Sequence, residues 1–263
     1  MSNAEAAIAY AREHRQAFLE DLQALLRIPS VSTLPERKDD VQRAAEWVAT
    51  QLRDLGLESV AVMETSGHPV VYGEWLKAGP EAPTVLYYGH YDVQPVDPLE
   101  LWVSDPFDPQ VRGDDIFARG ASDMKAQMVA HLKAVESMIR TTGLPINLKY
   151  LIEGEEEIGS PSLGAFIAEH KDLLSCDFCL NGDGGILAPD TPSITYALRG
   201  LAYFELRLQG PASDLHSGLF GGAVDNPALV LCQLIAGMRD RRGRITLPGF
   251  YDHVRPLTEA ERA

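Results

Sequence analysis

Apolar side chains recur at helical spacing in two stretches near the start of the chain. The first stretch covers residues 4–27 and ends before Pro29, a residue type that cannot continue a helix. The second follows Asp39 and Asp40, places its apolar positions on one face, and ends at Gly56. An Asp before such a run is a typical N-cap, and a Gly after it is a typical stop. The pattern therefore predicts two amphipathic helices.

Short apolar runs bounded by turn residues follow, and they alternate with further helical patterns. The predicted strands cover residues 59–65, 69–76, 84–92, 146–157 and 176–183, and the predicted helices between them cover 123–140 and 161–174. Strands interleaved with helices are typical of an α/β fold with a mostly parallel sheet. In such a sheet, ligands bind in the crevice at the carboxyl ends of the strands.

Beyond residue 192 the pattern changes. Two successive strand-like stretches, 193–200 and 201–210, precede a Gly-rich loop and an amphipathic helix at 226–239. These elements have an α+β character and differ from the interleaved pattern before them. We therefore predict two domains, which comprise residues 1–199 and 200–263.

The overall composition is that of a globular protein with an acidic surface. Of the 263 residues, 45% are hydrophobic and 23% are charged, and the formal net charge is −15. A chain this acidic is not expected to bind nucleic acid or an anionic membrane. No run approaches the ~20 apolar residues of a membrane-spanning helix, and the start of the chain lacks the pattern of a signal peptide.

The three cysteines favour a reducing compartment, because an odd number does not suit a disulfide framework. Cys176 and Cys179 form a C-x-x-C within the apolar stretch CDFCL. We interpret them as buried thiols of a strand rather than as a redox or zinc site. Together with the start of the chain, the cysteines predict a cytoplasmic protein.

His90 and Asp92 stand at the end of a predicted strand, in the sequence GHYDVQP. Side chains alternate along a strand, so these two point to the same face. A histidine that binds a metal commonly donates its other ring N–H to a carboxylate, which fixes its tautomer. The pair supplies both parts of such an arrangement. Taken alone, it also fits an ordinary hydrogen bond between a histidine and an aspartate.

Two aspartates stand where other predicted elements meet loops. Asp123 starts a helix after the segment 92–122, which is rich in Pro, Asp and Gly, and a loop of that length is usually functional. The alternative for Asp123 is a simple N-cap. Asp183 follows a buried strand and lies beside glycines, where a turn aspartate is the alternative. Both positions are expected at the crevice of the sheet.

Three adjacent carboxylates, Glu155–Glu157, end the apolar strand in the run EGEEEIGS. Such neighbours repel one another, and partial burial raises their pKa values, but bound cations reverse that penalty. One carboxylate can then ligate a metal while its neighbour accepts a proton from water. The alternative interpretation is a solvated charged face.

The series GHYDVQP, ARGASDMK, EGEEEIGS, NGD and DLHSG resembles the signature series of the co-catalytic dinuclear-metal family of aminoacylases, carboxypeptidases and dipeptidases. This family includes carnosinases, cytosolic nonspecific dipeptidases and acetylornithine deacetylase, and the chain is most similar to the carnosinase-like branch. The resemblance implies a three-layer α/β catalytic domain of the zinc-peptidase type. It also implies that residues 200–263 begin an α+β lid, or dimerisation, domain, which is truncated here.

The resemblance also implies a set of ligands for two divalent metal ions. His90 and Asp183 would bind one ion, Glu157 would bind the other, and Asp123 would bridge both. Zinc is the expected metal, and Mn²⁺ and Co²⁺ are compatible with the same ligands. Small-molecule substrates, either dipeptides or N-acyl amino acids, would bind at this pair of ions.

Three further residues have roles implied by the resemblance. Glu156 would be the general base that takes a proton from a water held by the two metals, and Asp92 would orient His90. His216 would stabilise the charge that develops on the carbonyl oxygen, from the opposite subunit of a homodimer joined by the lid domains. The implied reaction is hydrolysis of the peptide bond of a dipeptide or short peptide.

The chain departs from the family pattern in two places. Ala126 replaces the usual Gly after the Lys of the DMK motif, a small change near the start of a helix. In the family, a histidine from a later segment completes the second metal site, and we expect no equivalent here. Two alternatives therefore stay open. The chain could be an N-acyl amino acid amidohydrolase, or a catalytically incomplete fragment or subunit of a split enzyme.

Overall fold

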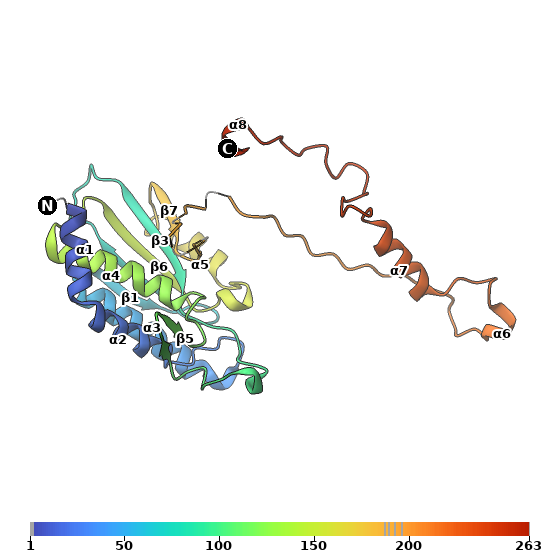
Figure 1. Ribbon diagram of the computed structural model, residues 1–263, viewed down its shortest axis with the longest axis horizontal. Coiled ribbons are helices and arrows are strands. Elements are labelled where there is room, and N and C mark those ends of the chain that lie inside the picture. Colours follow the sequence, from blue (N-terminus) through green and yellow to red (C-terminus); the bar gives the residue numbers. More distant parts are fainter. Residues whose placement is uncertain (1–2, 187, 189, 192, 196, 263) are drawn as a thin grey trace. The chain divides into compact units, whose positions relative to one another are not determined.

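The computed structural model describes residues 3–186, 188, 190–191, 193–195 and 197–262. The chain divides into two compact units, residues 1–195 and 196–263 (Figure 1).

The first two helices of the first unit are α1 (Asn3–Glu13) and α2 (Arg15–Leu26). The sequence pattern predicted one helix here, and that prediction was wrong at His14, which separates the two. The His14 ring stacks on Tyr10 at 3.9 Å, and its Nδ1 lies 2.9 Å from the Tyr10 carbonyl oxygen. The side chain thus contacts the same carbonyl that the backbone N–H of His14 uses.

The second predicted helix forms as α3 (Lys38–Asp54), and it buries the apolar face that its spacing predicted. Asp39 and Asp40 do not cap it, contrary to expectation, because both lie within its first turn. The N-cap is Arg37, whose guanidinium pairs with Asp40 at 3.0 Å. Carboxylates in the first turn stabilise a helix through its dipole. Gly56 follows the helix at φ +81°, as a helix stop requires.

A five-stranded sheet forms the centre of this unit, in the order β1-β2-β6-β3-β7. β1 and β2 are antiparallel, as are β2 and β6, whereas β6 and β7 both run parallel to β3. Four of these five strands therefore point the same way, which confirms the mostly parallel sheet. The strands are β1 (Glu58–Met63), β2 (Val70–Trp75), β3 (Thr84–His90), β6 (Asn147–Glu153) and β7 (Phe178–Asn181).

Helices cover both faces of the sheet. On one face, α4 (Lys125–Thr141) packs with α3 and the end of α2 against a core that includes Tyr87 and Tyr150. On the other face, α5 (Leu163–Glu169) packs through Phe166 against β2, β3 and β6. The two separate apolar cores give a three-layer arrangement, as Figure 1 shows.

The long segment 92–122 contains more regular structure than its composition suggested. It holds a short 3₁₀ helix, η2 (Leu99–Leu101), and a two-stranded hairpin of β4 (Gln110–Arg112) and β5 (Asp115–Phe117). The other short helices are η1 (Pro35–Arg37) and η3 (Glu156–Ile158).

The second unit contains α6 (Ser217–Phe220), α7 (Pro227–Gly237) and α8 (Glu259–Arg262). The helix predicted at 226–239 is thereby confirmed. The strands predicted over 193–210 are not formed by the described residues of that stretch. A strand needs a hydrogen-bonded neighbour, and within 197–262 the structure describes none for this segment.

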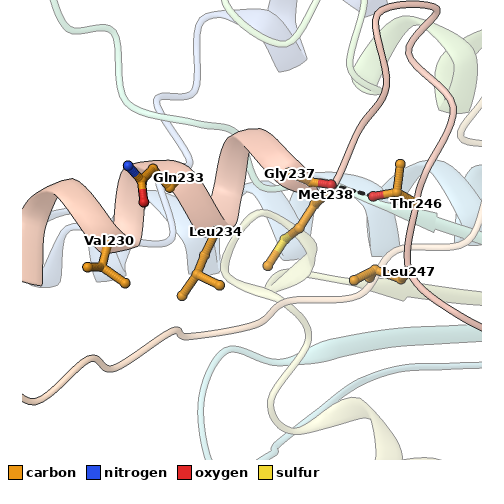
Figure 2. A pocket seen from close by; sticks show the side chains of 7 residues that line it. All are labelled: Val230, Gln233, Leu234, Gly237, Met238, Thr246 and Leu247. Carbon is orange, nitrogen blue, oxygen red and sulfur yellow. Dashed lines mark hydrogen bonds between the residues drawn. The ribbon is translucent and has the colours of Figure 1, made fainter.

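A groove runs along one side of α7 (Figure 2). Val230, Leu234 and Met238 point toward it, and Leu247 faces them from the following loop. The Thr246 hydroxyl donates to the carbonyl of Gly237, which holds that loop against the end of the helix. The groove is therefore a local feature of the second unit.

Cys179 lies exposed on β7, and Cys176 before that strand is half-buried. The prediction of two buried strand thiols was therefore wrong. β7 is the last strand of the sheet, and all four of its residues are exposed.

Among the described residues, no helix combines the length and the apolar character that crossing a bilayer requires.

Candidate metal centre

Three neighbouring parallel strands, β6, β3 and β7, end at the same edge of the sheet (Figure 1). His90 is the last residue of β3, and Asp183 lies two residues beyond β7. Glu156 and Glu157 follow β6 in η3. The carboxyl ends of adjacent parallel strands meet, so residues far apart in the sequence gather at one place.

Asp123 reaches the same edge from the start of α4. It is not the cap of that helix, because the N-cap is Met124 and no side chain makes a cap hydrogen bond. The side-chain nitrogen of Lys125, a fully buried residue, donates to the carbonyl oxygens of Leu25 (3.2 Å) and Ile28 (2.7 Å) at the end of α2. This contact anchors the turn that carries Asp123.

The ring of His90 is the centre of the cluster. Its Nε2 lies 3.1 Å from Asp123 Oδ1, 3.9 Å from Asp183 Oδ2 and 3.9 Å from Glu156 Oε2. Ligand atoms of His90, Asp123 and Asp183 all lie within 4.8 Å of one another, a spacing that can hold a metal ion. The structure therefore brings together three of the four predicted metal ligands.

Asp92 contacts both the ring of His90 and the backbone of η3, which carries Glu156 and Glu157. Its carboxylate lies 3.3 Å from His90 Nδ1, and its backbone oxygen lies 3.1 Å from the same nitrogen. The carboxylate also accepts hydrogen bonds from the backbone N–H groups of Glu156 (3.3 Å) and Glu157 (3.1 Å). These oxygens hold an N–H at Nδ1, which leaves Nε2 as the ring nitrogen that would bind a metal in place of its own proton.

The run EGEEE divides into buried and open carboxylates. Glu153 ends β6 and accepts hydrogen bonds from the hydroxyls of Tyr88 (2.6 Å) and Ser160 (2.8 Å). Glu155 is buried and accepts hydrogen bonds from the backbone N–H groups of His68 (2.9 Å) and Ser162 (3.1 Å). Both carboxylates therefore hold neighbouring segments in place, and neither is available as a ligand.

Glu156 and Glu157 are the open pair of this run, in η3. The predicted strand 146–157 was too long, because β6 ends at Glu153 and the chain turns there. Glu157 lies outside the three-residue group of His90, Asp123 and Asp183. Its Oε2 accepts a hydrogen bond from Gln94 Nε2 at 2.8 Å. Gln94 belongs to GHYDVQP, the motif that also contains His90 and Asp92. The sequence alone did not indicate a role for this glutamine.

The carboxylates around His90 repel one another. The pKa values of Glu156, Glu157 and Asp183 are all raised. Burial is the largest cause in each case, and repulsion from neighbouring carboxylates adds to it. A cation among them would relieve this repulsion.

Burial alone would lower the pKa of His90. The hydrogen bond and charge of Asp92, together with the charges of Glu156 and Asp123, outweigh burial and raise that pKa to about 9. The ring therefore lies in a strongly negative environment. One imidazole nitrogen among carboxylate oxygens suits Zn²⁺, and also Mn²⁺ or Co²⁺, so the residues present fit a divalent metal.

His216 belongs to the second unit, where it is the N-cap of α6. Its Nδ1 accepts a hydrogen bond from the backbone N–H of Gly218 at 3.0 Å, and its side chain is exposed. The units are not placed relative to each other, so its role at the centre stays a prediction.

The family model described as "Peptidase family M20/M25/M40" matches residues 86–258. This stretch holds the whole cluster around His90 and extends past His216. The chain belongs to the M20/M25/M40 peptidase family. The motif series had pointed to this family, and the prediction is confirmed.

Characterised members of the M20 family resemble the chain over most of its length. It is 33% identical over 264 residues to the Beta-Ala-His dipeptidase of Mus musculus, covering 95% of this chain and 54% of that protein. It is equally identical over 266 residues to the Cys-Gly metallodipeptidase DUG1 of Candida albicans, covering 95% and 55%. The chain thus spans about half the length of these relatives. Their names agree with the dipeptidase branch that the motifs predicted.

Solved M20 structures share the fold. The di-peptidase Dug1p of Saccharomyces cerevisiae matches with a TM-score of 0.75 and 27% identity, covering 100% of this chain and 58% of that one. Human carnosine dipeptidase 1 matches with a TM-score of 0.72 and 29% identity, covering 99% and 57%. The mixed α/β architecture with its mostly parallel sheet is therefore that of the family.

Proposed function

We propose that this protein is a metal-dependent dipeptidase that hydrolyses the peptide bond of dipeptides or short peptides. The observation that carries the proposal is the convergence of His90 Nε2 with oxygens of Asp123 and Asp183 at the sheet edge. The named activities of its relatives, on Beta-Ala-His and Cys-Gly, support dipeptides as the substrate class.

We assign His90 and Asp183 to one of two divalent ions, Glu157 to the other, and Asp123 to both. Zinc is our first choice of metal. When bound, such ions lower the pKa of water and polarise the carbonyl of the scissile bond. Asp92 would hold the proton at Nδ1, so that Nε2 is the nitrogen that binds the ion.

Glu156 is the proposed general base. Its carboxylate projects to within 3.9 Å of His90 Nε2, and partial burial raises its pKa toward the range in which a carboxylate can take and return a proton. It would accept the proton of the attacking water at a carboxylate oxygen and pass it to the leaving amine. We assign His216 to the stabilisation of charge on the carbonyl oxygen.

We further propose that residues 1–199 form a catalytic domain and that residues 200–263 belong to a lid through which two copies form a homodimer. Acidic composition and three free cysteines support a cytoplasmic protein that binds small molecules rather than nucleic acid or membranes.

The substrate class is tested by assaying the intact, metal-loaded chain on dipeptides and on N-acetyl amino acids. We expect release of free amino acids from dipeptides and little deacylation. Rapid deacylation without dipeptide cleavage would instead assign the chain to the N-acyl amino acid amidohydrolases. Metal binding without hydrolysis of either substrate would assign catalysis to a longer or assembled protein.

The general base is tested by Glu156→Gln, which keeps the shape of the side chain and removes its basicity. We expect kcat to fall by about 10²–10⁴-fold, the usual contribution of a positioned base, while metal content is unchanged. Glu169→Gln, at an exposed position of α5, is the matched control and should retain full activity. A Glu156→Gln enzyme with near-normal kcat would refute the assignment.

A further inference from the structure

A glutamine on the first turn of α4 contacts two of the loops that carry candidate ligands. Gln127 Nε2 donates to the carbonyl oxygen of Ser122 and, at 3.3 Å, to the carbonyl oxygen of Gly184. Ser122 immediately precedes Asp123, and Gly184 immediately follows Asp183. One side chain therefore bridges the backbone next to both aspartates of the candidate metal group.

The amide of Gln127 acts here only as a donor. Its Oε1 is buried and has no hydrogen-bond partner among the described residues, whereas both contacts of the side chain run through Nε2. Each N–H of a primary amide can serve one carbonyl, so the NH₂ group matches two acceptors on separate loops. A side chain of equal size without that group would leave both carbonyls without this donor.

The other hydrogen bonds of the Asp183 loop do not connect it to the turn that carries Asp123. The loop of Asp183 is held on the strand side, where Gly182 N–H donates to the Tyr88 carbonyl at 2.9 Å. The Asn181 side chain accepts from the Asp183 N–H at 2.8 Å. Neither contact relates this loop to the turn of Asp123, which belongs to another element. The bond from Gln127 to Gly184 spans that gap, across 57 residues of sequence.

We propose that Gln127 is a positioning residue of the metal centre, which sets the spacing of Asp123 and Asp183 by bridging the backbone beside each of them. The proposal rests on the metal-dependent function proposed above. A metal with two aspartate ligands on separate loops needs them at a fixed separation, and residues that hold ligands from behind commonly contribute 10–100-fold to metal affinity.

The test is a Co²⁺ titration of the intact chain, followed by visible absorption and by competition with a chelator. In Gln127→Met, which keeps the length of the side chain but has no donor, we expect the affinity for the tightest-bound Co²⁺ to fall roughly 10–100-fold. The absorption spectrum should change as the ligand geometry relaxes. The unfolding temperature of the metal-free protein reports separately on any damage to the fold.

Gln110→Met is the matched control. Gln110 Nε2 also donates to two oxygens, the carbonyl (3.2 Å) and the carboxylate (2.9 Å) of Asp108, but none of these belongs to the centre. Its Co²⁺ affinity and spectrum should equal those of the unmodified chain. An equal loss in Gln110→Met and Gln127→Met would overturn the proposal.

A double-mutant cycle separates positioning from general destabilisation. In the background of Asp183→Asn, the effect of Gln127→Met on Co²⁺ affinity should shrink, because one of the two ligands it positions has been weakened. An undiminished effect would contradict positioning, as would wild-type affinity in the single variant. A wild-type chain that binds no Co²⁺ would overturn the proposed function and this proposal together, whereas wild-type binding without an effect of Gln127→Met overturns only this one.

Discussion

Each unit of the chain contains a helix with many apolar residues, but the helix of the first unit is buried and that of the second is exposed. In the first unit, α4 buries Leu132 and Met128 against the sheet and contributes to a continuous core. In the second unit, α7 is richer in apolar residues, yet none of its side chains is buried, and Leu234 is 49% exposed. Apolar sequence forms a helix in both units, but only the sheet provides a surface that covers it. The buried apolar cores and the candidate metal group therefore both belong to the first unit.

The sharpest form of this comparison is a pair of equal substitutions. Leu132→Ala removes a side chain that is 1% exposed and should lower the free energy of unfolding by about 2–5 kcal/mol, as cavity-forming changes in a core do. Leu234→Ala in α7 should change it by less than about 0.5 kcal/mol. Urea unfolding of both variants, followed by fluorescence, measures the difference. Equal effects would mean that α7 is as well packed as α4 and would break the comparison.

A half-buried histidine should make the first unit sensitive to acid. The ring of His131 stacks on Tyr87 at 3.9 Å, and Tyr150 lies 3.3 Å from its Nδ1. Burial lowers the pKa of His131 to about 4. The unfolded chain takes up this proton near pH 6.5, whereas the folded chain resists it until about pH 4. Folding stability should therefore fall as pH decreases through this window, by about 3 kcal/mol in total.

The substitution His131→Phe removes this titration. Near pH 7 the variant should be less stable than the wild type because the Tyr150 hydroxyl loses its partner, but its stability should fall less steeply between pH 6.5 and 4. Urea unfolding at several pH values gives the slope. His216→Asn, at an exposed position of the second unit, should keep the wild-type slope. If His131→Phe also keeps it, burial of His131 is not the source of acid sensitivity.

The smallest expected effect concerns the cap of α7. Asn226 Oδ1 accepts a hydrogen bond from the Ala228 N–H at 2.9 Å, and such a cap is worth about 1 kcal/mol. Asn226→Ala should speed amide hydrogen exchange in residues 228–237 about fivefold, which is 1 kcal/mol expressed as a rate. Exchange in α4 should not change. Slower exchange in α4 than in α7 of the wild type is the baseline, and its reversal would contradict the comparison.

Much of the first unit could be predicted from its sequence, because its signals are local. The apolar run that ends at His90 forms a strand with its polar residues at the sheet edge, as expected. The helical face of α3 was likewise visible in its spacing. Where the structure depends on distant partners, the same patterns misled. The strands predicted over 193–210 have no described neighbour, and Cys179 is exposed because its strand lies at an edge.

The residues of the candidate site could be predicted from the sequence, but their orientations and hydrogen-bond partners could not. Which glutamates of EGEEE face the centre depends on where β6 ends, and that end lies at Glu153 rather than after Glu157. The carboxylate of Glu155 accepts hydrogen bonds from the backbone N–H groups of His68 and Ser162. No pattern in the sequence indicates these contacts. The role of Gln127 could not be predicted for a similar reason. Both of its hydrogen-bond partners are backbone carbonyls, which every residue has.

The most direct test of the central claim is the metal affinity of the intact chain with one residue changed in each unit. Asp123→Asn removes a carboxylate from the candidate group in the first unit, and His216→Asn changes the second unit. Isothermal titration with Zn²⁺ should show at least a 100-fold loss of affinity for Asp123→Asn, about 2.7 kcal/mol, and no loss for His216→Asn. Wild-type affinity in Asp123→Asn would contradict a metal centre at this edge of the sheet.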